Sequence, residues 1–211
     1  MTDATAETNP QTAPFASLVL DEQRLHALAD ALVARQRREL TAVAESTEFS
    51  DDARASLADA IAALPAATGA QDEAAVALLE VLWARVTGRD TAEHVCSLVI
   101  ASGIAMDAIA ELAKLSGTSI EAHEAFTAST AAIISALEIC FAADTKLDDR
   151  LAMWGRRVAG DTVVWSREIV GIEPGMSADE LTAGAEAGAE RFAKALFAEH
   201  SRRMNLLKLA A

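Results

Sequence analysis

Histidine and acidic side chains are the groups in this chain with the clearest capacity for metal or acid–base chemistry. Each histidine lies on a different predicted helix and has an acid within four positions: His26, His94, His123 and His200. Glu93 and His94 are adjacent and point about 100° apart on a helix, so they cannot hold one ion together. Glu22 and His26 have i, i+4 spacing and could do so. We interpret these histidines as exposed or boundary residues, with a rearranged metal site as the alternative.

A second group of acids interrupts otherwise apolar helix faces. Asp107 and Glu111 share a face with Ile100 and Ile104, and Glu138 lies on a similar stripe of the next predicted helix. Burying an unpaired carboxylate is costly. We therefore interpret these acids as lying at helix edges or pairing with arginine. The alternative is a polar pocket or a remnant carboxylate site inside the bundle.

The composition argues against several classes of function. The formal net charge of −14 disfavours generic nucleic-acid binding, which requires a basic face. Three arginine clusters, among them Arg202 with Arg203, are interpreted as solvated helix surface. The sequence contains no Ser/His/Asp arrangement, glycine-rich phosphate loop or Cys/His cluster that would indicate another enzyme class.

Cysteine usage and the N-terminal segment bear on location and domain organisation. Cys96 and Cys140 lie in apolar runs without metal-type spacing, which indicates buried, reduced thiols and a cytoplasmic protein. Residues 1–17 have no basic segment or long apolar core, so we expect a disordered tail and no signal peptide. Residues 18–211 are expected to form a single helical domain.

Hydrophobic periodicity predicts an all-α protein without strands. Thr118 with Glu121 has the spacing of a capping box that opens one helix, and Ser177 with Glu180 repeats it for the last. Uncharged runs at 95–106 and 125–137 predict two buried helices, and neither run reaches the roughly 20 apolar residues of a membrane span. The helix with the first run is predicted at about 91–115, and the other helices at about 21–46, 50–65, 72–86 and 148–170, with the last one ending near 207.

Trp154 and Trp165 lie on one apolar stripe of the predicted helix 148–170. Packing of a C-terminal hairpin against the bundle is the simplest interpretation. The alternative is a subunit interface, where tryptophan anchors are common. Because helical bundles with more than one apolar face frequently bury the surplus by dimerising, we expect a homodimer.

The C-terminal third carries a family resemblance. The runs RLAMWGRRVAGDTVVWSRE from Arg150 and LFAEHSRRMNLL from Leu196 resemble the end of bacterial ferritin-like proteins related to the tRNA 2-methylthio-isopentenyladenosine hydroxylase. Weaker similarities are GIAMDAIAELA from Gly103 and RRELTAV from Arg37. The resemblance implies a ferritin-like four-helix bundle with an additional C-terminal helical hairpin.

Metal-binding members of that family would hold a di-iron pair with two lone carboxylates and two Glu-x-x-His units. By this resemblance Glu39 matches the first lone carboxylate and Asp107 could match the second. No Glu-x-x-His occurs in the sequence, and the expected positions read SLADAIAALPAA and FTASTAAIISAL. We therefore expect no metal site. If one exists, its candidate ligands are Glu39, Asp107, Glu111, Glu138 and His123.

Three functions follow from these observations. We favour a degenerate ferritin-like protein that has lost its metal site and acts in binding or assembly, as a homodimer or with a ferritin-like paralogue. One alternative is an iron-dependent hydroxylase or oxidase with altered ligands. Another is a bundle that binds a small apolar ligand in the alanine-lined interior between the two apolar helices, which has the least support from the sequence.

Overall fold

The computed structural model describes residues 21–66, 72–144, 146–170 and 185–209. Seven helices and no strand occur in these ranges, so the predicted all-α helical bundle is confirmed. The predicted N-terminal tail lies outside the described residues, as does the capping box of Ser177 with Glu180. The helices are α1 Glu22–Ala44, α2 Asp51–Ala63, α3 Glu73–Val86, α4 Thr91–Leu115, α5 Ala122–Ala143, α6 Leu147–Glu168 and α7 Ala185–Leu206.

Side-chain caps define where four of the helices begin. At each of these starts, an oxygen of the N-cap side chain accepts a hydrogen bond from a backbone N–H three residues further on. The residues are Asp21, Ser50, Asp72 and Asp90. The capping box predicted at Thr118 is wrong, because its hydroxyl donates to Glu22 Oε1 over 2.9 Å. Glu121 occupies the N-cap of α5 and makes no side-chain cap bond. Thr118 therefore ties the α4–α5 connection to α1.

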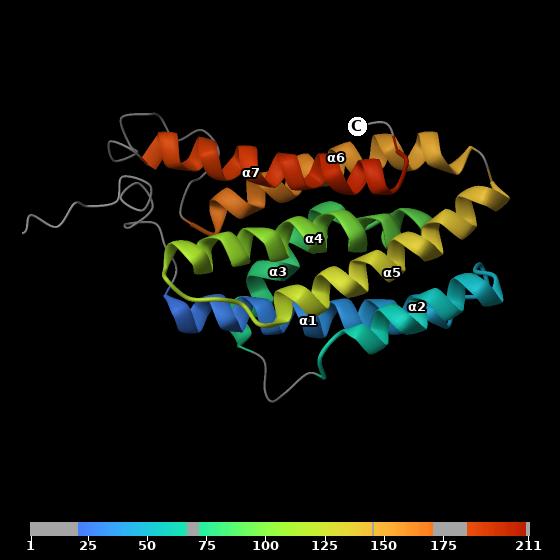
Figure 1. Ribbon diagram of the computed structural model, residues 1–211, viewed down its shortest axis with the longest axis horizontal. Helices are drawn as coiled ribbons and strands as arrows, with labels where there is room; N and C mark the ends of the chain where they lie inside the picture. The colour runs from blue at the N-terminus through green and yellow to red at the C-terminus, as the bar shows by residue number, and fades with distance from the viewer. Residues whose placement is uncertain (1–20, 67–71, 145, 171–184, 210–211) are drawn as a thin grey trace, which may run out of the picture.

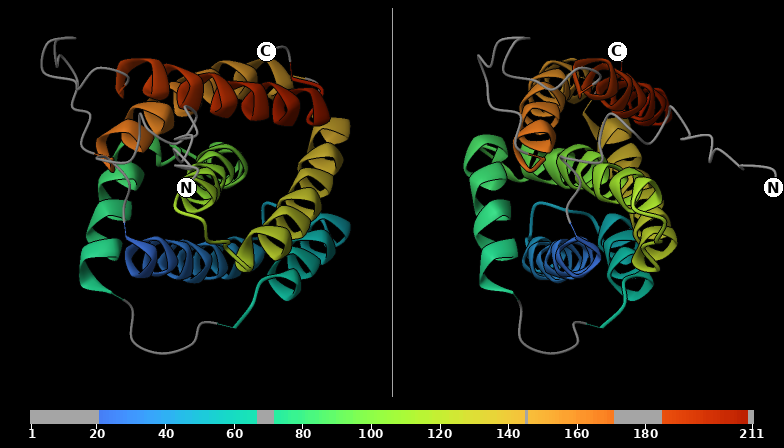
Figure 2. Two further views of the ribbon diagram at one scale, coloured as in Figure 1. Left: turned by 60° about the vertical axis from the view of Figure 1, so that its left-hand side comes forward. Right: turned by 90° about the vertical axis from the view of Figure 1, so that its left-hand side faces the viewer.

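Helix α4 lies at the centre of the bundle. Figure 2 shows it surrounded by the other long helices, and it packs against α1, α5, α6 and α7. Every residue from Val95 to Met106 is buried, which confirms the prediction from its uncharged run. One cluster of buried apolar side chains draws on all seven described helices. The hydrophobic core is thus built around α4.

Helix α5 is less buried than its uncharged sequence predicted. By length and composition alone, both α4 and α5 are apolar enough to cross a membrane. In the most apolar 18-residue window, 89% of α4 is buried but only 33% of α5. The exposed side of α5 carries small residues such as Thr127, Ala128 and Ala131. Burial in the core explains the apolar composition of α4, and α5 presents small side chains to one side of the bundle.

Helices α6 and α7 run antiparallel beside one another across α4 (Figure 1). Trp154 and Trp165 of α6 are 7% and 1% exposed. The indole N–H of Trp154 is 2.9 Å from Ser97 Oγ and 3.1 Å from the Glu93 carbonyl, and that of Trp165 donates to the Leu78 carbonyl over 2.8 Å. The two tryptophans pack the core of the chain, so a subunit interface would have to use other residues.

Candidate functional site

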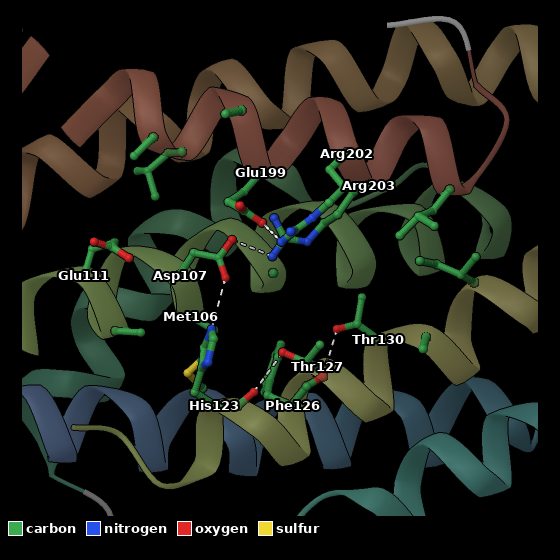
Figure 3. A pocket seen from close by; sticks show the side chains of 18 of the residues that line it. Met106, Asp107, Glu111, His123, Phe126, Thr127, Thr130, Glu199, Arg202 and Arg203 are labelled. Carbon is green, nitrogen blue, oxygen red and sulfur yellow. Dashed lines mark hydrogen bonds and ion pairs between the residues drawn. The ribbon is translucent and has the colours of Figure 1, made fainter. Parts of the chain in front are cut away.

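A cavity of about 630 Å³ lies between α4, α5 and α7 (Figure 3). Helix α4 supplies its floor, while α5 and α7 form its walls. The space exists because α7 packs on α4 and α6, and because small residues line it: Ala110, Ala131, Ala195 and Ala198. Its volume lies within the range of about 300 to 1,000 Å³ that is usual for small-molecule sites.

Asp107 is the polar centre of this cavity. Its Oδ1 lies 3.3 Å from His123 Nε2 on α5, and its Oδ2 accepts a hydrogen bond of 2.6 Å from Arg203 Nη2 on α7. Burial raises the pKa of the Asp107 carboxyl, but His123 and Arg203 together outweigh this effect and hold the pKa below its ordinary value. Because an ionised carboxylate can only accept hydrogen bonds, His123 Nε2 carries the proton, and both oxygens of Asp107 are occupied.

Arg203 reaches Asp107 because α4 has a glycine beneath it. A Cβ on Gly103 would lie 2.5 Å from Nε and 2.8 Å from Cζ of Arg203. The guanidinium thus lies directly against the α4 backbone, and its side chain is only 13% exposed. Its Nη1 is buried and has no hydrogen-bond acceptor among the described residues. One donor of this side chain therefore lacks a partner.

The rim of the cavity carries two further ion pairs. Glu111 accepts from Lys114 Nζ over 2.5 Å on α4, and Glu199 pairs with Arg202 on α7. Together with Asp107 and Arg203, the lining contains three acids and three permanent cations. The described lining therefore has no net charge when His123 is neutral.

The five candidate metal ligands predicted from the sequence do not come together. Asp107, Glu111 and His123 all line the cavity, but only Asp107 and His123 are in contact. Glu39 lies elsewhere, beside His94 of α4, and Glu138 pairs with Lys208 over 3.0 Å. No group of three or more His, Cys, Asp or Glu side chains that could hold a metal occurs among the described residues. The residues present do not fit a di-iron pair.

Glu39 belongs to a separate polar cluster between α1, α3 and α4. Its two oxygens lie 3.3 Å from Arg35 Nη2 and 3.3 Å from His94 Nε2. Arg35 also pairs with Glu80, and its Cζ lies 4.9 Å from the centre of the Trp83 ring. Each charge in this cluster has an opposite partner, which is the pattern of an interhelical tie.

Glu93 forms another tie, between the starts of α4 and α6. Its buried carboxylate accepts from Arg89 over 2.7 Å and lies 3.3 Å from Arg150 Nη1. The hydrogen bond from the Arg89 side chain is the main cause that lowers the pKa of Glu93 to about 2. Burial opposes this shift, while the Arg89 backbone N–H and the charges of both arginines support it.

The sequence-based interpretation of Arg203 as solvated surface is wrong, whereas that of Arg202 is correct. Arg202 is 69% exposed, but Arg203 is 13% exposed and lies over α4. The signal that could have found Arg203 is its place directly before Met204, at the edge of the apolar stripe of α7. The interpretation that these acids pair with arginine or lie at helix edges is confirmed, because Asp107 pairs with Arg203, while Glu111 and Glu138 are 41% and 40% exposed and pair with lysines.

Comparison with models of known protein families found no match, and no curated protein matches the chain either. The resemblance to ferritin-like proteins, and the specific bundle arrangement that it implies, stay predictions.

Proposed function

We propose that this protein is a metal-independent helical bundle that binds a small amphipathic molecule in the cavity between α4, α5 and α7. The observation that carries this proposal is the cavity itself, about 630 Å³ in volume, with apolar walls and a few charged groups that converge at Asp107. Concave apolar sites with a small number of placed polar groups are typical of ligand binding.

The arrangement of the acids favours binding over iron-dependent oxidation. A di-iron site needs several carboxylates and histidines around one point. In the described part of the chain, Glu39 and Glu138 lie away from Asp107, and each of these acids already has a cationic partner. We infer that the metal chemistry of the family that this chain resembles has given way to a binding role.

A role in assembly is compatible with ligand binding. Met153 on α6 and Phe197 on α7 are 67% and 46% exposed, so a partner could cover apolar surface on the C-terminal hairpin. We retain a homodimer or a complex with a ferritin-like paralogue as proposals, together with a cytoplasmic location. Light scattering tests the first of these, and a strictly monomeric, partnerless protein would contradict it.

The ligand proposal is tested by filling the cavity from its floor. Ala110 lines the cavity from α4 and is 6% exposed, so an Ala110→Leu side chain has to enter the open space. Ala128 is exposed on α5 and does not line the cavity, which makes Ala128→Leu the matched control. Isothermal titration calorimetry with dodecanol below its solubility limit and dodecanoate below its micelle concentration reports binding.

We expect the wild-type protein and Ala128→Leu to bind at least one of these probes at one site per chain. Ala110→Leu should weaken binding about tenfold or more, because the added atoms occupy the ligand's space. Its thermal stability should be unchanged or higher, since filling a cavity adds contacts. Absence of binding to the wild-type protein, or undiminished binding to Ala110→Leu, would contradict the proposal.

A further inference from the structure

The polar centre of the cavity contains a cationic hydrogen-bond donor that has no partner among the described residues. Both oxygens of Asp107 are taken, one by His123 and the other by Arg203. Arg203 Nη1 has no acceptor among the described residues. The His123 side chain is 40% exposed, and its Nδ1 becomes a further donor when the ring takes up a proton. A ligand completes this site if it brings an acceptor oxygen.

The charges of the lining select among acceptor groups. All three lining acids are paired with cations on α4 or α7, so a cationic ligand would find no free carboxylate. An anion would add one negative charge to a balanced lining. A proton on His123 restores the balance. A single negative charge therefore fits the site better than two.

The shape of the negative group follows from Arg203. A guanidinium presents its N–H groups as a planar fork that matches the two oxygens of a carboxylate. Only one side of the Arg203 fork is occupied, since Nη2 donates to Asp107 while Nη1 has no described acceptor. The apolar part of the ligand has Met106, Phe126 and Leu206 available in the same cavity.

From this geometry we propose that the cavity binds an apolar chain with one carboxylate head, and that binding is coupled to protonation of His123. This inference rests on the proposed function, because it assigns the chemical class of the ligand that the same cavity takes. The carboxylate lies beside Arg203 and His123, and the proton that His123 takes up comes from solvent. No bond of the ligand is made or broken.

The test compares three probes that share a twelve-carbon chain and differ in the head: dodecanoate, dodecanol and dodecyltrimethylammonium. Calorimetric titration is performed at about pH 6 and about pH 8, in buffers of different ionisation enthalpy. We expect dodecanoate to bind about tenfold or more tightly than dodecanol and to bind more tightly at the lower pH. The buffer dependence of the heat should show proton uptake near the lower pH.

His123→Gln should remove both the pH dependence and the proton uptake, while dodecanol binding is retained. His94→Gln is the matched control, because His94 also pairs with a carboxylate, that of Glu39, outside the cavity. The control should keep the pH dependence of the wild-type protein. An unchanged pH dependence in His123→Gln would overturn the coupling to this residue.

The three heads separate the failure of this inference from failure of the proposed function. Equal affinity for dodecanoate and dodecanol, or a preference for the cationic probe, would overturn the carboxylate inference and leave the ligand-binding function standing. Failure of all three probes to bind the wild-type protein would count against the function itself.

Discussion

Replacing Gly103 by alanine should destabilise the protein, whereas the same change at Gly160 should stabilise it. Both glycines lie inside helices, where a change to alanine contributes about 1 kcal/mol. A Cβ at Gly160 meets nothing within 4 Å, but a Cβ at Gly103 would lie 2.5 Å from Nε of Arg203. The Arg203 guanidinium would therefore have to leave its place against α4.

The magnitude follows from the ion pair that this movement breaks. Removing one partner from a fully buried ion pair costs about 3 to 5 kcal/mol. Asp107 and Arg203 are each 13% exposed, so water can partly replace the lost contact, and we take about half of that cost. After subtraction of the helix-propensity gain, Gly103→Ala should lower the free energy of unfolding by about 1 kcal/mol. Gly160→Ala should raise it by a similar amount.

Urea denaturation measures both changes through the transition midpoint, provided that the slope stays constant. A double-mutant cycle supplies the control. In an Arg203→Met background the guanidinium is absent, so Gly103→Ala should become stabilising, as at Gly160. Stabilisation by Gly103→Ala in the wild-type background would refute the account of how Arg203 is held.

Three further predictions concern groups with shifted pKa values. The pKa of Glu93 is lowered from 4.5 to about 2, so its contribution is present above pH 4.5 and is lost as the pH falls toward 2. The full pKa shift corresponds to about 3 kcal/mol of folding stability, and the exposure of Arg89 reduces this contribution to about 1 to 2 kcal/mol. Glu93→Gln should remove this acid dependence, which urea titrations at several pH values measure. Burial, together with the nearby Arg203 charge, lowers the pKa of His200 below 6.5, so the stability of the fold should fall as the pH drops below 6.5. His200→Gln should flatten this dependence of the melting temperature on pH. Burial raises the pKa of Cys96 to about 12, so this thiol should not react with iodoacetamide in the folded protein, while the less buried Cys140 should react. Mass spectrometry after the treatment measures both modifications. Rapid modification of Cys96 would show that α4 is not enclosed.

The sequence was sufficient to predict the helices but not every contact that begins or ends them. Periodicity and turn residues placed α4 at 91–115, which agrees with the structure. The start of α5 was missed because the partner of Thr118 is Glu22, 96 residues away in the chain. Local capping rules cannot predict such a partner, since it depends on how α1 packs beside the α4–α5 connection.

The candidate site was predictable in its parts and not in its assembly. Asp107 and Glu111 were found because acids on apolar stripes are conspicuous, and His123 because histidines are few. The pairing of Arg203 with Asp107 could not be predicted, since it requires α7 to pack on α4 with the guanidinium over Gly103. The cavity likewise depends on the packing of α7 against α4 and α6, and the hydrophobic periodicity of α5 does not predict this packing.

The same limit applies to the tryptophans. Their place on one stripe of α6 allowed either core packing or a subunit interface. The deciding contacts are the hydrogen bonds from Trp154 to Ser97 and from Trp165 to the Leu78 carbonyl, and both join segments far apart in the sequence. Burial of both side chains then follows from the packing of α6 against α3 and α4.

A crystal structure of the protein with dodecanoate would test the central claim most directly. We predict electron density for the alkyl chain between α5 and α7, with the carboxylate within hydrogen-bond distance of Arg203 and His123. A structure in which dodecanoate lies elsewhere on the surface, while the cavity at Asp107 holds only water, would contradict the assignment of this cavity as the ligand site.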